Sequence, residues 1–360
     1  MRFVRFLYYL CTEMRKILLF VCSALVVVSA CRNGHQSNEV RHHQFKTDVM
    51  LKATPVQNQG RSSLCWAYAM LGTIESERLM LGDSVNLSVD YLARMLLKEQ
   101  AREAFFAGGR KQVSLRGTAS MALRLLERYG MLHEDTYPGQ QVNYNVLARK
   151  VQLAASRSAG LQKMDGRVDE MLDSQVGFMP RFVFFRHAEY TPKQFAHSVC
   201  LPHEYLSLTS FTHHPYGHSF ALEIPDNRYR DTFMNIPLDT LMAHVKGALQ
   251  TGHPVCWEGD ISEPGFSFAQ GVAKLPNEAV NVTPAVRQRQ FETQKTTDDH
   301  CMVLMGLAHD KQGKTYYIAK NSWGKNNPFR GYMYLSDNYL RLKTVAVYMS
   351  QAAYGGDKPS

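Results

Sequence analysis

A cysteine at the expected start of a helix is the residue in this chain with the clearest capacity for chemistry. Cys65 follows a polar loop that contains Gly60, and it precedes apolar residues and good helix formers from Trp66 onward. Unpaired backbone N–H groups and the positive dipole end at the first turn of a helix favour a thiolate over a thiol. An isolated cysteine is nevertheless more often a small buried hydrophobe. Cys65 alone therefore does not decide between a nucleophile and a core residue.

Two distant polar residues supply what a nucleophilic cysteine needs. Such a cysteine requires a base for its proton and a group that orients the base. His300 precedes the apolar run Cys301–Leu304, and Asn321 follows the expected strand at 316–320. If a hairpin joins these strands, the Asn321 side chain accepts the imidazole N–H and leaves the other ring nitrogen for the thiol. Taken singly, His300 and Asn321 are typical of a structural histidine and a turn, and we interpret most other histidines as incidental. The combination predicts a Cys-His-Asn site.

These residues resemble the motifs of the papain-like cysteine peptidases. Gln59-Gly60 precedes Cys65-Trp66 at the spacing of that family's oxyanion-hole glutamine. Asn321-Ser-Trp-Gly324 is similar to the family's Asn-Ser-Trp-Gly motif, and His300 stands before it where the base is expected. The resemblance implies that Cys65 is the nucleophile and His300 the base. It further implies that Asn321 orients His300 and that Gln59, with the Cys65 backbone N–H, holds the oxyanion.

Further landmarks extend the resemblance over nearly the whole chain after residue 50. Leu87-Ser88 is similar to a segment that follows the active-site helix in the family, and Gly117 with the helix ending at Tyr129-Gly130 matches the next landmark. The resemblance implies that Gly117 binds substrate. The stretch Gly252–Asp260 resembles the bleomycin hydrolase and aminopeptidase C branch. The chain between nucleophile and base is roughly 100 residues longer than in papain, with most of the excess within residues 150–250.

The branch resemblance implies a papain fold, peptide-bond hydrolysis through an acyl-enzyme, and aminopeptidase trimming. The chain departs from the family at Ser62, where secreted papains have a disulfide cysteine, and at Ser63-Leu64, where Gly-Arg or Gly-Ser usually precedes the nucleophile. Its last residues, 351–360, do not resemble the end that lies in the cleft of bleomycin hydrolases. Exopeptidase action, substrate preference and oligomeric state therefore stay open at this point.

The elements that must position these residues divide the chain into a helical and a strand-rich part. Periodicity predicts helices at 86–97, 121–129 and 146–176. Apolar runs between turn residues predict strands, interrupted by a single helix at 238–250, and these strands lie at 182–185, 218–224, 254–257, 301–307, 315–321, 331–335 and 345–348. Helices followed by strands favour an α+β fold.

The resemblance gives this α+β fold a papain-like arrangement. A peptidase domain is expected over residues 47–351. Residues 47–200 would form a mainly helical left subdomain, and residues 201–351 a mainly β, barrel-like right subdomain. The active site would lie in the cleft between the two subdomains. Residues 352–360 are expected to be a flexible tail.

The first 46 residues are predicted to be a targeting segment and a tether. A basic stretch and the apolar run 17–28 lead into Ser29-Ala30-Cys31, which resembles the lipobox of bacterial lipoproteins. We therefore expect residues 1–30 to be a lipoprotein signal peptide, Cys31 to be lipidated, and residues 31–46 to be a polar tether. An ordinary cleaved signal peptide is the alternative, and Met14 is an alternative start. The protein is expected to be exported, membrane-anchored, and to face the periplasm or cell surface.

Composition limits the other classes of function. The chain has 360 residues, 45% hydrophobic content and a formal charge of +9, and it has no long basic run interleaved with aromatic residues. We therefore expect a globular protein that does not bind nucleic acid. None of the seven cysteines forms a Cys-x-x-Cys pair or a cluster with zinc spacing, so we expect no metal and no cofactor. Peptides are the expected substrates. Two alternatives are a non-catalytic peptide-binding lipoprotein that retains the fold, and a cell-wall amidase.

Overall fold

The computed structural model describes residues 44–139 and 142–355. The chain divides into one unit of residues 1–46 and a second of residues 47–360. The predicted signal peptide and the lipidation site Cys31 lie outside the described residues, as does all of the tether before residue 44. Within the described ranges, no helix combines the length and apolarity needed to cross a bilayer.

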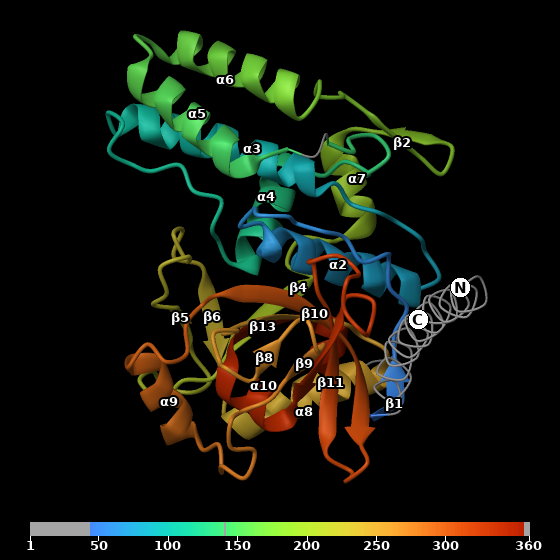
Figure 1. Cartoon of the computed structure of the whole chain (residues 1–360). Helices are drawn as coiled ribbons and strands as arrows, with labels where there is room; N and C mark the ends of the chain where they lie inside the picture. The colour runs from blue at the N-terminus through green and yellow to red at the C-terminus, as the bar shows by residue number, and fades with distance from the viewer. Residues whose placement is uncertain (1–43, 140–141, 356–360) are drawn as a thin grey trace, which may run out of the picture. The chain divides into compact units, whose positions relative to one another are not determined.

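Helices dominate the chain up to residue 200 (Figure 1). Ser88 caps the second of these helices by accepting a hydrogen bond from the Tyr91 backbone N–H, at 3.1 Å. Gly130 ends the third with a φ of +85°, a conformation that favours glycine. The elements of this part are β1 (Phe45–Met50), α2 (Cys65–Met80), α3 (Val89–Phe106), α4 (Ala119–Tyr129), α5 (Tyr144–Arg157), α6 (Leu161–Gln175), β2 (Val183–Phe185), β3 (Ala188–Tyr190) and α7 (Pro192–Val199).

A large sheet dominates the rest of the chain. In the described residues it has eleven strands, of which ten follow the order β5-β6-β4-β13-β7-β10-β11-β12-β9-β8. The eleventh strand, β1, pairs with β10. The other ten are β4 (Tyr205–Thr209), β5 (Ser219–Ala221), β6 (Thr232–Asn235), β7 (Val255–Gly259), β8 (Phe266–Ser267), β9 (Val272–Ala273), β10 (His300–Asp310), β11 (Thr315–Lys320), β12 (Tyr332–Ser336) and β13 (Thr344–Ser350). The central strands β7, β10 and β13 are almost wholly buried, as expected for strands covered on both faces.

Helices pack against this sheet and place the site. Helix α2 packs against β10 and β7, and α8 (Leu238–Thr251) also packs against β10. Figure 1 shows α2 between the sheet and helices α3, α4, α5 and α6. The start of α2 and the start of β10 therefore lie at one junction between helices and strands. The predicted α+β class is confirmed.

Several predicted elements differ from the structure. The helix predicted at 146–176 is two helices, α5 and α6, because Ser158 and Gly160 have extended backbone between them. The strand-rich part contains more than the single helix predicted, since α9 (Pro284–Glu292) and α10 (Asp337–Lys343) also form there. In α9 only Arg287 and Gln288 are buried, so the sequence carries no apolar period to find.

The predicted flexible tail also begins differently. Helix α11 (Gln351–Gly355) includes residues 352–355, which were expected to belong to that tail. The Ser350 hydroxyl accepts a hydrogen bond from the Ala353 backbone N–H at 3.1 Å, and Ala353 is buried. A cap and one apolar anchor hold this short helix on the domain. Residues 356–360 lie outside the described part of the chain.

Candidate active site

Cys65 is the first residue of α2, as the sequence predicted. The preceding residue, Leu64, offers no side-chain cap, so the first-turn N–H groups are not satisfied by that side chain. The approach to the helix turns at Gly60, whose φ of +60° favours glycine. Trp66 is completely buried, and its Nε1–H donates to the Leu115 carbonyl at 2.8 Å. The helix start is therefore anchored, while Cys65 itself stays partly accessible.

The surroundings of Cys65 favour its thiolate. Hydrogen bonding from the Cys301 thiol, together with His300 and the Cys301 backbone N–H, holds the pKa of Cys65 well below its ordinary value, although burial opposes the shift. Burial and the Cys65 sulfur beside it raise the pKa of the Cys301 thiol well above its ordinary value. The pair therefore carries its negative charge on Cys65 and its proton on Cys301. Burial also raises the pKa of Cys200 and Cys256, which makes them packed thiols.

His300 and Asn321 are adjacent. His300 begins β10 and Asn321 directly follows β11, which pairs with β10 antiparallel. The His300 Nε2 and Asn321 Oδ1 atoms lie 2.8 Å apart. The same oxygen accepts the Ser322 backbone N–H at 2.7 Å, which fixes the orientation of the amide. With Nε2 bound to Asn321, the Nδ1 atom of His300 is the nitrogen left for the Cys65 thiol.

An aromatic cover lies over this hydrogen bond. The Trp323 ring centroid is 4.7 Å from that of His300. Phe268 in turn packs edge-on against Trp323 at 5.4 Å, and Phe266 does so at 6.0 Å. His300 and Asn321 are both buried. A hydrogen bond shielded from water in this way holds the imidazole more firmly than an exposed one would.

Gln59 lines the same cavity as Cys65, and hydrogen bonds hold its side-chain amide in place. The Ser322 hydroxyl donates to Gln59 Oε1 at 2.6 Å, and Gln59 Nε2 donates to the Ser62 carbonyl at 2.8 Å. The Gln59 backbone N–H also donates to the Ser322 carbonyl at 2.8 Å. Since an amide nitrogen carries two hydrogens, one Nε2–H is left for a ligand.

Cys65, His300 and Gln59 line one cavity of about 160 Å³. Gly117 lines it as well, and a Cβ at this position would lie 1.8 Å from the Cε of Met121. Any larger residue at this position would therefore require the Met121 side chain to move. The full lining consists of Gln59, Ser62, Ser63, Cys65, Trp66, Arg116, Gly117, Asp226, Ile261, Asp298, Asp299, His300, Cys301 and Trp323. The structure thus brings together Cys65, His300, Asn321, Gln59 and Gly117 from distant parts of the chain.

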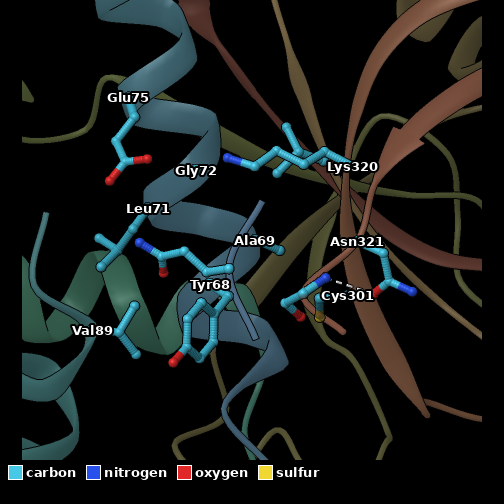
Figure 2. A pocket seen from close by; sticks show the side chains of 12 residues that line it. Tyr68, Ala69, Leu71, Gly72, Glu75, Val89, Cys301, Lys320 and Asn321 are labelled. Atoms are coloured by element: carbon cyan, nitrogen blue, oxygen red, sulfur yellow. Dashed lines mark hydrogen bonds between the residues drawn. The ribbon is translucent and has the colours of Figure 1, made fainter. Parts of the chain in front are cut away.

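A much smaller cavity of about 20 Å³ lies behind the site (Figure 2). Figure 2 shows the Lys320 side chain pointing toward α2 at Gly72, with Glu75 further along the same helix. The Lys320 ammonium donates to the Thr54 hydroxyl at 2.8 Å, and that hydroxyl donates to Glu75 at 2.5 Å. Glu75 also accepts the Leu87 backbone N–H at 2.8 Å. Asn321 and Cys301 line this cavity too, so the cluster supports the active site from within.

Sequence reasoning missed a buried carboxyl pair beside Cys65. Glu258 lies in β7 and is completely buried, and Asp298 precedes His300 and lines the active-site cavity. Burial raises the pKa of Glu258 to about 7, and burial together with Glu258 raises that of Asp298 well above its ordinary value. Glu258 stands in the stretch Gly252–Asp260 that the sequence had singled out, and Asp298 lies two residues before His300. The sequence feature that could have identified them is a carboxyl residue placed next to apolar strand residues.

A second missed cluster is His213, His214 and Glu223. Their potential ligand atoms lie within 4.8 Å of one another, which is a grouping that could hold a metal ion. As they stand, His214 Nε2 and His213 Nε2 contact Glu223 at 2.7 and 3.1 Å. The sequence had shown two adjacent histidines with no ligand spacing around them, because Glu223 joins them only across the fold of the chain.

Comparison with known proteins agrees with this arrangement. Residues 184–353 match the Peptidase C1-like family. Aminopeptidase G from Lactobacillus delbrueckii subsp. lactis is 22% identical, over 82% of this chain and 80% of the relative. The crystal structure of PepW from Lactobacillus rhamnosis HN001 is similar with a TM-score of 0.69 and 18% identity, over 88% of this chain and 84% of that one. The PepW match supports the predicted papain-like fold, and the family match over residues 184–353 together with these relatives supports a papain-like cysteine peptidase.

Proposed function

We propose that this peptidase cleaves peptide bonds through an acyl-enzyme formed on Cys65. The observation that carries the proposal is the His300 Nε2 to Asn321 Oδ1 contact of 2.8 Å next to a cysteine at a helix start. In this proposal Cys65 and His300 form a thiolate–imidazolium pair. Asn321 acts as a positioning residue, because it fixes the ring so that Nδ1 faces the sulfur.

The proposed cycle has two halves. The thiolate attacks the carbonyl carbon, and the negative charge on the carbonyl oxygen is held by Gln59 Nε2–H and the Cys65 backbone N–H. His300 then gives its proton to the leaving amine, which breaks the C–N bond and leaves a thioester. Water attacks the thioester while His300 takes one of its protons. The acid product leaves, and the thiolate–imidazolium pair is restored.

Hydrolysis of fluorogenic peptide substrates by the wild type and by Cys65→Ala tests this proposal. The expected result is turnover by the wild type and its loss in the variant. Equal activity of the two proteins would reject Cys65 as the nucleophile. Iodoacetamide labelling separates the remaining alternative: if the four cysteines of the described chain react equally slowly, the protein is a peptide-binding relative without a reactive thiol.

We further propose that the enzyme removes residues from free N-termini. The name of its relative, aminopeptidase G, supports this mode of action. A peptide library with free and with acetylated N-termini, digested and read by mass spectrometry, tests it. Cleavage restricted to the residue next to a free N-terminus is the expected result. Internal cleavage of acetylated peptides at comparable rates would show an endopeptidase instead.

We also propose that the enzyme is exported as a lipoprotein anchored through Cys31. The support is the sequence Val-Ser-Ala-Cys at residues 28–31 after an apolar run. Expression of the full chain in a bacterium with labelled palmitate tests the anchor. Label is expected in the membrane fraction for the wild type. For Cys31→Ser we expect no label, and a soluble or uncleaved protein. Equal labelling of the two would reject Cys31 as the lipidated residue.

A further inference from the structure

A buried pair of carboxyl groups lies beside the proposed nucleophile. Glu258 Oε2 accepts the Tyr348 hydroxyl at 2.6 Å and the Ala119 backbone N–H at 3.2 Å. Glu258 Oε1 and Asp298 Oδ2 are buried and have no N–H or hydroxyl donor among the described residues. Beyond the effect of burial, Asp298 lowers the pKa of Glu258 and Glu258 raises that of Asp298. Since neither carboxylate carries a donor of its own, a shared proton would satisfy both side chains.

No cation of the described chain compensates this pair. The nearest candidate is Arg116, which lines the same cavity. Its guanidinium binds Asp226 at 2.9 and 3.0 Å, and its contact with Asp298 goes to the backbone carbonyl, at 3.3 Å. The ionisable groups that act on the pair include Cys65 from α2, Arg116, Asp226, Cys256 from β7, Cys301 from β10 and Tyr348 from β13. Arg116 is the positive group among them, and Asp226 occupies it. His300 lines the same cavity, and in the proposed function its imidazolium is paired with Cys65.

The position of Asp298 connects the pair to the substrate. Its side chain is 9% exposed and it lines the same cavity as Cys65, Gln59 and Gly117. Buried carboxyl groups are normally matched by a cation or by several donors. Here Asp298 lies at the wall of a cavity that admits a ligand, and Glu258 is completely buried and does not itself line that cavity. A cation entering the cavity can supply the missing donors and displace the shared proton.

We propose that Glu258 and Asp298 form a subsite for a positively charged group of the substrate, an ammonium or a guanidinium. The proposal rests on the proposed peptidase function and gives it a substrate class. Two parts of a peptide carry this chemistry: the free α-amino group of an N-terminal residue, and the side chain of lysine or arginine one residue before the cleaved one. The first would select N-termini, and the second would select basic sequences.

Two matched pairs of aminomethylcoumarin substrates distinguish these sources. Alanyl-coumarin and acetyl-alanyl-coumarin differ in the free α-amino group. Acetyl-lysyl-alanyl-coumarin and acetyl-norleucyl-alanyl-coumarin differ in the side-chain ammonium alone. We expect one charged substrate to exceed its neutral partner in kcat/KM by about tenfold or more, because hydrogen bonds to charged groups are among the strong ones. The matched pair in which the charged substrate is preferred identifies the positive group that the subsite binds, either the α-amino group or the side-chain ammonium.

Glu258→Gln and Asp298→Asn test the residues. In each variant the preference for the charged substrate should fall to about one- to threefold, while hydrolysis of the neutral partner continues. Glu134→Gln is the matched control, since Glu134 is another carboxyl whose pKa burial raises to about 8, and it does not line the cavity. Alkylation of Cys65 gives the concentration of folded enzyme, and thermal unfolding identifies a variant that fails to fold.

The wild type offers a second measurement that needs no variant. Because the pKa of Glu258 is raised to about 7, the pair is more negative above this pH than below it. The kcat/KM ratio of charged to neutral substrate should therefore rise as pH increases through about 7. Taking the ratio cancels any pH dependence of the catalytic steps that both substrates share.

The outcomes separate the two proposals. If no substrate is hydrolysed, the proposed peptidase site is wrong. If all four substrates are hydrolysed and neither charged one is preferred, the peptidase site stands and the cation subsite is overturned. A preference that survives unchanged in both Glu258→Gln and Asp298→Asn also overturns it. A preference that disappears in these variants but not in Glu134→Gln supports it.

Discussion

The carboxyl groups of Glu75 and Glu258 are both completely or almost completely buried. Glu75 has a cation in its hydrogen-bonded cluster, whereas Glu258 has another carboxyl group beside it. Glu75 belongs to a cluster in which Thr54 bridges it to the Lys320 ammonium, with the Leu87 N–H as a further donor. Glu258 faces a second carboxyl, Asp298. Burial raises the pKa of both glutamates. The first carboxyl has a cation within the protein, and the second does not.

This difference indicates how a buried charged group that stabilises the fold can be distinguished from one that binds a ligand. The first has a charged partner within the protein, and the second does not. The Glu75 cluster lies inside the domain behind Asn321, and its charges can balance without any other molecule. The Glu258 pair lies beside the proposed nucleophile at a cavity wall and needs a proton or a ligand. We therefore expect changes in the inner cluster to affect stability, and changes in the cleft to affect turnover.

The largest expected effect is in the cleft. Cys65→Ala removes the proposed nucleophile, and kcat should fall by about 10⁴-fold to 10⁶-fold, as for nucleophiles of other hydrolases. The side chain is small and partly exposed, so the free energy of unfolding should change by less than about 1 kcal/mol. Steady-state hydrolysis and denaturant unfolding measure the two quantities. If Cys65→Ala lost stability but kept its turnover, the expectation that changes in the cleft affect turnover rather than stability would be contradicted.

Removing the inner cation should do the opposite. Lys320→Met leaves Glu75 without a positive partner, and the free energy of unfolding should fall by about 3–5 kcal/mol. The loss should be greater at pH 8 than at pH 5, because the uncompensated Glu75 must be protonated to stay buried, and protonation becomes harder as pH rises.

The double variant Glu75→Gln/Lys320→Met provides the control for this effect. In the wild type, burial lowers the pKa of Lys320 and raises that of Glu75 despite their attraction, so the pair itself carries a large desolvation cost. The double variant should be more stable than Lys320→Met and should lose the added pH dependence. Chemical denaturation at both pH values measures this. Equal stability of the single and double variants would contradict an uncompensated Glu75 as the cause.

The sequence predicted the cleft better than it predicted the inner cluster. Cys65, His300 and Asn321 could be found because a catalytic set requires particular residue types next to strands and helix starts. The α+β class followed from apolar periodicity in long elements such as α4 and β10. The assignment of these residues to catalysis is still a prediction that the proposed variants test.

The remaining features could not be read from sequence, for physical reasons. Glu75 and Lys320 belong to an ordinary helix and an ordinary strand, and only the fold brings them to Thr54. Glu258 and Asp298 carry no local sign that they share a proton. Helix α9 buries few residues, so it has no apolar period, and α11 depends on one cap and one buried alanine.

Gln59 tests whether the cleft acts through its hydrogen-bond donors. Gln59→Ala should lower kcat by about 10²-fold to 10³-fold, which is typical for the loss of one oxyanion donor. KM should change little, since the donor acts mainly on the transition state. Ser322→Ala is the matched variant, because it removes the donor to Gln59 Oε1 and leaves the amide in place, and its effect should be smaller. An unchanged kcat in Gln59→Ala would remove Gln59 from the oxyanion site.

The smallest expected effect concerns the second thiol in the cleft. Cys301→Ala removes a hydrogen-bond donor to the Cys65 thiolate, so the pKa of Cys65 should rise toward its ordinary value. A group with a raised pKa ionises at higher pH, and the rate of Cys65 alkylation by iodoacetamide should therefore reach its midpoint at a higher pH than in the wild type. Turnover at neutral pH should fall by less than about tenfold, because one neutral hydrogen bond has a modest net worth.

Cys256→Ala is the control for this shift, since Cys256 is buried in β7 and is absent from the groups that lower the pKa of Cys65. Its alkylation profile should match the wild type. The same midpoint in Cys301→Ala and the wild type would show that His300 alone sets the thiolate. The Cys301 thiol would then not contribute to the lowered pKa of Cys65, and Cys301 would be a packed thiol like Cys200 and Cys256.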